Sequence, residues 1–195
     1  TITATGNDVT LDLATNDFDS NDNGDKLTVI GKDVNIQDSD ALKLAPTISG
    51  KLTVLAGGNI DDGGLSDVYG ITDITSTSGY VKFNDNCSGG GCSDFKDVVN
   101  IHAGGGQIIL KDANSIELGT ITTTGNFTLT ASQDTTGTVT QTDTGTITIA
   151  GITAITNTGG DVRLHRTTND FASDGAGAVK ITGANVEVVD GEAFL

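Results

Sequence analysis

Apolar residues alternate with polar ones in short runs along the whole chain. Leu27 and Val29, and later Phe127 and Leu129, are separated by single Thr residues. A period of two residues places the apolar side chains on one face of a β-strand and the Thr, Asp and Lys between them on the other. No segment of helix length shows a 3.6-residue period. The pattern therefore predicts an all-β chain of short strands, each of about four or five residues.

The inner face that this alternation predicts is aliphatic, with a few Phe side chains. Its expected members, in chain order, are Ile2, Val9, Leu11, Leu13, Leu27, Val29, Val34, Ile36, Leu42, Leu44, Leu52, Val54, Ile60, Val81, Phe83, Val98 or Val99, Ile101, Ile108, Leu110, Ile116, Leu118, Ile121, Phe127, Leu129, Val139, Ile147, Ile149, Ile152, Ile155, Val162, Val179, Ile181, Val186, Val188, Phe194 and Leu195.

The chain also repeats itself. Asp8–Phe18 recurs as Asp161–Phe171, with the blocks Asp-Val-x-Leu and Thr-Asn-Asp-Phe at the same spacing. In a second frame, Gly70–Phe83 aligns without a gap on Gly151–Leu164. These spacings give a long period of roughly 70 to 80 residues, and a fixed period is typical of repeat proteins. We divide one domain into segments of about 1–79, 80–160 and a partial 161–195.

Short strands with one apolar face are compatible with a sandwich, a barrel or a β-helix. Strands that recur at roughly 8 to 11 residues, and fragments that return in the same order, favour the β-helix, in which like residues stack above like. The main alternative is a pair of Ig-like domains, but the chain lacks their Cys, Trp, Cys framework and tyrosine corner. We predict a parallel β-helix of about nine or ten coils, about 45 Å long at a strand spacing of roughly 4.8 Å.

Composition supports this architecture and excludes some functions. The chain has 27 Gly, one Pro and no Trp or Met, and 35% of its residues are apolar, which is low for a compact globule. Its net charge of −16 opposes binding to nucleic acid or to anionic membranes, because both need a basic surface. No signal peptide and no apolar run long enough to span a bilayer is visible, so we expect no membrane insertion.

Three stretches carry a resemblance to a known family. They are Thr168–Phe171 with Gly177–Val186, Asp112–Gly119, and Gly125–Ala131. These runs resemble the filamentous-haemagglutinin-like adhesins of bacterial two-partner secretion. The resemblance covers most of the chain, although such motifs specify a coil shape more than an activity. It implies a right-handed parallel β-helix that is exported across the outer membrane and acts at the cell surface in adhesion.

The two ends of the chain resemble consecutive parts of one repeat. Phe194-Leu195 matches the run that ends at Leu118, and the Gly- and Thr-rich segment that follows Leu118 resembles Thr1–Asn7. One interpretation is a piece of a longer array. The other is a subunit that stacks head to tail through open end coils, since an uncapped β-helix presents unpaired backbone groups and such a contact does not close.

Cys87 and Cys92 enclose a Ser-Gly-Gly-Gly loop that has no counterpart in the repeat around Asp161. In an exported chain we expect this pair to form a disulfide that stabilises the fold by roughly 2 kcal/mol. A metal site would need two more ligands, and His102 is the nearby candidate. The loop is also a weak candidate for partner binding.

The densest acidic cluster suggests a metal. Asp19, Asn21, Asn23 and Asp25 alternate around Gly24, as in the first half of a calcium loop, but Ile30 stands where such a loop has its Glu. The alternatives are a calcium site and a solvated turn. We therefore expect no required cofactor, with calcium as the one candidate.

We expect no catalytic site. Some β-helices act on polysaccharides with clustered carboxylates and an Arg base, but the two Arg of this chain, Arg163 and Arg166, flank His165 on an expected outer strand face. His102 is also expected on a strand surface. A further alternative is ice binding by stacked Thr-x-Thr runs, of which Thr120–Thr122, Thr128–Thr130, Thr138–Thr140 and Thr146–Thr148 are the members.

The function that these observations favour is a structural rod or stalk segment of an extracellular bacterial surface adhesin. A self-assembling extracellular filament subunit is the second hypothesis, and a polysaccharide-acting β-helix enzyme is the third. The expected partners are copies of the chain or flanking coils at the end faces, together with ligands on host or neighbouring surfaces.

Overall fold

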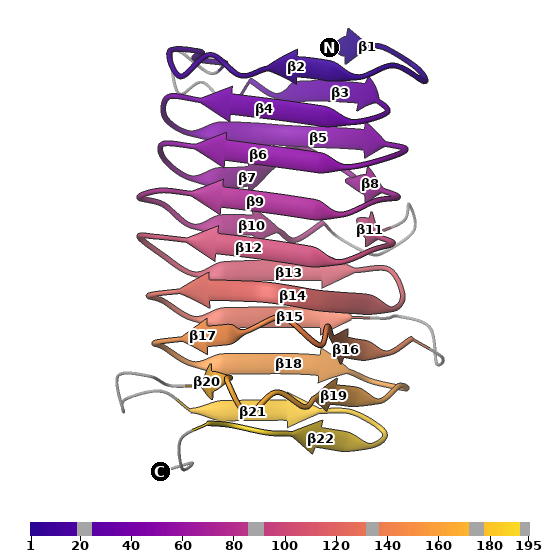
Figure 1. Ribbon diagram of the computed structural model, residues 1–195, viewed down its shortest axis with the longest axis vertical. Helices are drawn as coiled ribbons and strands as arrows, with labels where there is room; N and C mark the ends of the chain where they lie inside the picture. The colour runs from indigo at the N-terminus through magenta and orange to yellow at the C-terminus, as the bar shows by residue number, and fades with distance from the viewer. Residues whose placement is uncertain (19–24, 86–91, 132–136, 172–177, 192–195) are drawn as a thin grey trace.

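The computed structural model describes residues 1–18, 25–85, 92–131, 137–171 and 178–191. In these residues the chain winds as a flattened coil whose turns stack along one long axis, from β1 at one end of the stack to β22 at the other (Figure 1). All strand pairs are parallel, and no helix occurs in the described ranges. The predicted all-β fold, a parallel β-solenoid, is confirmed.

Two sheets form the walls of the coil, and each coil contributes one level to each sheet. The main path of the first sheet contains β1 (Ile2–Thr3), β3 (Leu27–Gly31), β5 (Leu42–Ile48), β7 (Ile60–Asp62), β10 (Val81–Phe83), β13 (Ile108–Asp112), β15 (Phe127–Ala131), β18 (Thr153–Asn157) and β21 (Val179–Thr182). Beside this path lie β8 (Asp67–Val68) and β11 (Asp94–Phe95).

The second sheet has the same construction. Its main path contains β2 (Val9–Leu11), β4 (Val34–Asp38), β6 (Leu52–Ala56), β9 (Thr72–Ser76), β12 (Val99–Ala103), β14 (Ile116–Thr123), β16 (Val139–Gln141), β19 (Val162–Leu164) and β22 (Val186–Val188). Beside it lie β17 (Ile147–Ile149) and β20 (Asp170–Phe171).

The register places apolar residues directly above one another. Leu110 on β13 pairs with Phe83 on one side and with Leu129 on the other, and all three side chains are fully buried. The neighbouring outward positions are half-buried, as in β13, where buried and half-buried residues alternate. The interior is therefore one continuous apolar column rather than a set of separate cores.

The alternation fails at three of the predicted inner positions. Leu13 is 67% exposed and Ile152 is 47% exposed. Both lie in turns just outside the strands, where the period of two no longer fixes the side-chain direction. Val186 is also exposed, on the last described strand of its sheet.

Adjacent residues on β13 provide a test of the ladder. Leu110→Ala removes a fully buried side chain between Phe83 and Leu129, and should lower the unfolding free energy by about 2–5 kcal/mol. Ile109→Ala changes the half-buried outward neighbour and should cost about 1 kcal/mol or less. Urea denaturation of both variants checks this, and equal losses would contradict the assignment of inner and outer faces.

Candidate functional site

Some levels of the solenoid are interrupted, and the interruptions come in pairs. Below the long strand β5, the next two levels of the first sheet are split into β7 with β8 and β10 with β11. Below the long strand β14, the next two levels of the second sheet are split into β16 with β17 and β19 with β20. Several side-chain hydrogen bonds between levels lie at these interruptions.

The strands that follow two of the interruptions, β11 and β20, each consist of an Asp-Phe pair, and a third such pair lies near the start of the chain. The three copies are Asp17-Phe18, Asp94-Phe95 and Asp170-Phe171, each preceded by Asn or Ser. On the next level, an Asp ends or follows the neighbouring strand, at positions 38, 112 and 190. We call each Asp-Phe pair, together with the Asn or Ser before it and the Asp on the next level, an Asp-Phe corner.

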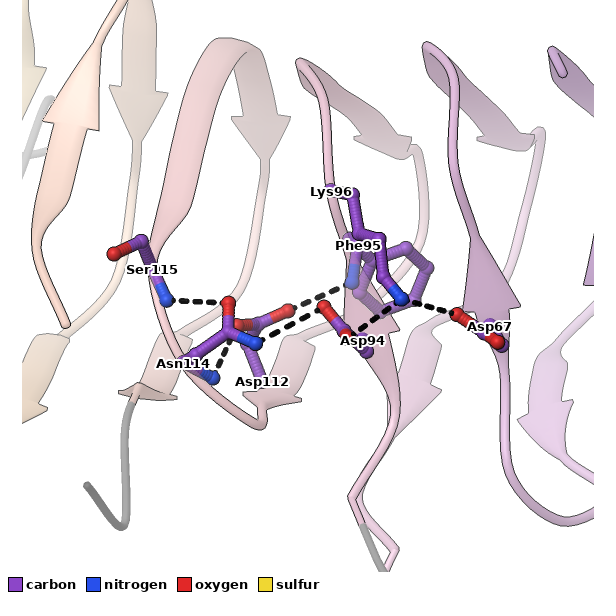
Figure 2. A network of polar contacts seen from close by, with 7 residues as sticks. All are labelled: Asp67, Asp94, Phe95, Lys96, Asp112, Asn114 and Ser115. Carbon is purple, nitrogen blue, oxygen red and sulfur yellow. Dashed lines mark hydrogen bonds and ion pairs between the residues drawn. The ribbon is translucent and has the colours of Figure 1, made fainter. Parts of the chain in front are cut away.

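The middle Asp-Phe corner shows how two levels are joined (Figure 2). The Asp112 carboxylate accepts the backbone N–H of Phe95 on the preceding level at 2.9 Å through Oδ2. Its Oδ1 accepts the N–H of Asn114, also at 2.9 Å, which holds the turn that follows β13. One buried carboxylate therefore satisfies a donor on each level.

The first corner repeats this geometry. Asp38 accepts the N–H of Phe18 at 3.0 Å and that of Asp40 at 3.1 Å. A backbone bond beside the carboxylate occurs in all three corners. The donor and acceptor pairs are Ser39 N to Asn16 O at 2.7 Å, Ala113 N to Ser93 O at 2.8 Å, and Gly191 N to Asn169 O at 2.7 Å.

Burial controls the ionisation of the corner carboxylate. Asp112 is 1% exposed, and its burial raises its pKa to about 7, although the N–H groups of Phe95 and Asn114 act in the opposite direction. Burial also raises the pKa of Asp38. A carboxylate that is so enclosed cannot reach a solute, so its chemistry in the folded protein is that of a clamp between levels.

A partly exposed chain of charges covers the clamp. The Lys96 ammonium lies 2.9 Å from Asp94 and 3.0 Å from Asp67 on the preceding level, and 3.9 Å from the ring centroid of Tyr69. The hydrogen bond to Asp94 is the largest cause of the raised pKa of Lys96. Asn114 donates to Asp94 at 3.4 Å from the following level. Three successive levels are thus connected on the outer surface.

The predicted metal and disulfide residues are only partly described. Asp19, Asn21 and Asn23 lie outside the described residues, whereas Asp25 is exposed just before β3. Cys87 also lies outside them, and Cys92 is half-buried next to Ser93. The calcium loop and the disulfide therefore stay predictions. In the described ranges, no group of three or more His, Cys, Asp or Glu side chains is placed to hold a metal.

Arg163, His165 and His102 lie on the outer surface, as predicted, whereas Arg166 is half-buried and its Nε is a buried atom without a hydrogen-bond partner in the described structure. Two of the exposed residues contact a carboxylate. Arg163 pairs with Asp161 at 2.7 Å, and His165 lies 3.2 Å from Asp143. His102 is exposed on β12, between Thr75 and Thr122 in register.

The Thr-x-Thr runs do not share one face. Thr122 and Thr148 pair on the second sheet, whereas Thr128 and Thr130 belong to the first sheet. Thr130 stands next to Lys111. The flat Thr surface considered for ice binding is therefore wrong for these runs.

The comparisons with known proteins agree with the repeats. A family model described as repeats of unknown function (DUF5649) matches residues 31–102 and 105–176. The chain belongs to this family. No curated protein and no solved structure matches it. No helix in the described part of the chain is long and apolar enough to cross a membrane.

The two DUF5649 matches begin 74 residues apart, and the structure shows what one repeat is. It comprises seven strand levels, counting each interrupted pair once: β4, β5, β6, β7 with β8, β9, β10 with β11, and β12. The eighth level, β13, opens the second match. Because seven is odd, β4 lies in the second sheet and β13 in the first. Successive repeats therefore present the same features on opposite faces of the solenoid.

Sequence reasoning missed the middle corner and all three corner carboxylates. Two signals in the sequence could have found them. Asp94-Phe95 is a further copy of the Asp-Phe pair, and an Asp follows the last apolar residues of three predicted strands, at positions 38, 112 and 190. The spacings of 74 and 78 residues between these Asp positions match the long period.

Asp112→Asn tests the clamp. The amide keeps the shape but replaces one acceptor oxygen by a donor, so one N–H loses its partner and the unfolding free energy should fall by about 1–3 kcal/mol. Asp94→Asn, at the partly exposed rim, is the matched control and should cost about 1 kcal/mol or less. Equal effects in urea denaturation would contradict the clamp.

The difference in unfolding free energy between the wild type and Asp112→Asn should depend on pH. Because the folded-state pKa of Asp112, about 7, lies above its ordinary value of 3.8, the folded protein holds this proton more tightly than the unfolded chain. Its contribution is complete below about pH 4 and declines as the pH rises through 7. The stability advantage of the wild type over Asp112→Asn should shrink across this range, and a constant difference would contradict the assignment.

Proposed function

We propose that this chain is a non-catalytic rod segment of an extracellular bacterial surface adhesin. The observation that carries the proposal is the seven-level repeat, which continues in parallel register from one DUF5649 match into the next. A unit of this kind lengthens a solenoid without changing its interior, because each level contacts only its neighbours.

The polar contacts support a mechanical role. Carboxylates in the described corners accept hydrogen bonds from adjacent levels, and Lys51 and Lys96 pair with Asp73 and Asp67 of adjacent levels. These contacts connect levels along the axis rather than converging on one point. The net charge of −16 favours solubility of an exposed rod.

The surface location rests on the resemblance to filamentous-haemagglutinin-like adhesins. Antibodies raised against the purified chain should label intact cells of the bacterium that produces it in immunogold microscopy. Protease added outside the cells should remove the label without lysis. Label that appears only after permeabilisation would overturn the proposal. Fibres that grow from the purified chain with concentration would instead favour the filament hypothesis.

Removal of one repeat tests the rod. Deletion of residues 31–104 joins β3 to the segment before β13 and places Asp112 where Asp38 stood, opposite Phe18. Because one repeat is three and a half coils, the longest dimension should decrease by about 17 Å at a strand spacing of roughly 4.8 Å. Small-angle X-ray scattering measures this, and a folded product of unchanged length would contradict the extensible rod.

A further inference from the structure

In the described residues, the first sheet is interrupted, and so has an opening, on two consecutive levels. β7 ends at Asp62 and the strand resumes with β8 at Asp67, while on the next level β10 ends at Phe83 and β11 begins at Asp94. Polar residues occupy this opening. Ser66 and Ser93 are fully buried there, and Asp62 continues the inward series of Ile60. We call Asp62, Ser66, Asp85 and Ser93 the acidic interruption.

The four side chains of the acidic interruption form one connected group. The Asp62 carboxyl group accepts the N–H of Gly64 at 2.8 Å and is in hydrogen-bond contact with the Asp85 carboxyl group of the next level, a contact in which one of the two groups carries a proton. The Ser93 hydroxyl donates to Asp85 and accepts the N–H of Ser66 at 3.0 Å. Two acidic side chains of adjacent levels therefore lie beside two hydroxyl groups.

A buried hydroxyl in this group lacks a partner. Ser66 is 0% exposed, and its Oγ has no hydrogen-bond partner in the described structure. The alternation of buried Ser66, half-buried Asp67 and buried Val68 turns the Ser66 side chain inward, on the level next to Ser93, whose hydroxyl accepts the Ser66 N–H. A buried hydroxyl without a hydrogen-bond partner is unfavourable, so a ligand that contacts the Ser66 Oγ would stabilise the folded protein.

The second repeat contains a matched version of the same opening that is closed without charge. Gln141 ends β16 where Asp62 ends β7, and Asn169 precedes β20 where Ser93 precedes β11. Their amides bond reciprocally, at 2.6 Å from Gln141 to Asn169 and 2.9 Å in return. Asn169 also accepts the N–H of Ile147 at 3.1 Å, as Ser93 accepts that of Ser66.

The comparison of the two openings indicates what the acidic one lacks. A neutral amide pair supplies its own donors and acceptors, whereas two adjacent carboxylates need a positive charge or a shared proton between them. Lys26 and Lys111 lie nearby and donate to the backbone carbonyls of Gly63 and Asp85, at 2.8 and 3.2 Å.

We propose that the acidic interruption binds a divalent cation of the calcium type between Asp62 and Asp85, with the Ser66 and Ser93 hydroxyls as further ligands. Calcium accepts six to eight oxygen ligands in flexible geometry, so backbone carbonyls and water complete the shell. With two carboxylates, the site belongs to the weak extracellular class, with a dissociation constant of about 10⁻⁴ to 10⁻³ M. This site differs from the loop at Asp19 to Asp25 and does not depend on the proposed function.

Calorimetric titration of the full chain with calcium chloride at pH 7.5 tests the proposal, with magnesium chloride as the comparison salt. The wild type should bind calcium in the stated range. Asp62→Asn and Asp85→Asn should each weaken binding at least tenfold, and Ser66→Ala should weaken it less. Asp143→Asn, whose carboxyl is 93% exposed, is the control and should leave binding unchanged.

The melting temperature without calcium separates binding from folding. Asp62→Asn replaces one of two adjacent acidic groups by a neutral amide, so this variant should melt at or above the wild-type temperature and yet gain less from 10 mM calcium. A wild type that shows neither heat nor a higher melting temperature at 10 mM calcium would overturn the proposal. Calcium binding that survives Asp62→Asn and Asp85→Asn unchanged, and is lost on Asp19→Asn, would also overturn it in favour of the earlier loop.

Discussion

The parallel register between successive levels is the constraint on which the rest of this structure depends. Every strand in the described sheets is hydrogen-bonded to strands one coil away. The paired residues are 17 positions apart for Val29 and Pro46 and 27 positions apart for Ile2 and Val29. This register places Phe83, Leu110 and Leu129 in one column. A shift of one residue would turn an apolar face outward, so the buried column and the register maintain each other.

The interruptions are where this regularity is relaxed, and they are held by polar groups instead. At the middle corner, Asp112 accepts N–H groups from two levels, and Lys96 joins two further carboxylates above it. The buried carboxylate is unfavourable by itself, as its raised pKa shows. It nevertheless stabilises the corner, because it accepts the backbone N–H groups of Phe95 and Asn114, which would otherwise lack partners. In the described residues β11 pairs with β8 on one side and with no strand on the other.

The odd number of levels in a DUF5649 repeat has a consequence for the surface. A repeat with an even number would place every copy of an interruption on one face, whereas seven levels alternate the copies between the two sheets. The acidic opening at Asp62 and the amide-closed opening at Gln141 accordingly lie on different sheets. The two copies therefore have separate surroundings, which allows one to diverge in chemistry while the backbone path is kept.

The sequence by itself determined the all-β class, the parallel stacking and the long period, because alternation and self-similarity are properties of neighbouring residues and of copies. It also determined the inner position of residues such as Leu110 and the outer position of Arg163 and His102. Only the tertiary structure decided that Leu13 and Ile152 face solvent, that Asp112 meets Phe95, and that Asp62 meets Asp85. These contacts join different coils, and the number of residues in each turn and interruption, rather than any local pattern, sets which side chains come together.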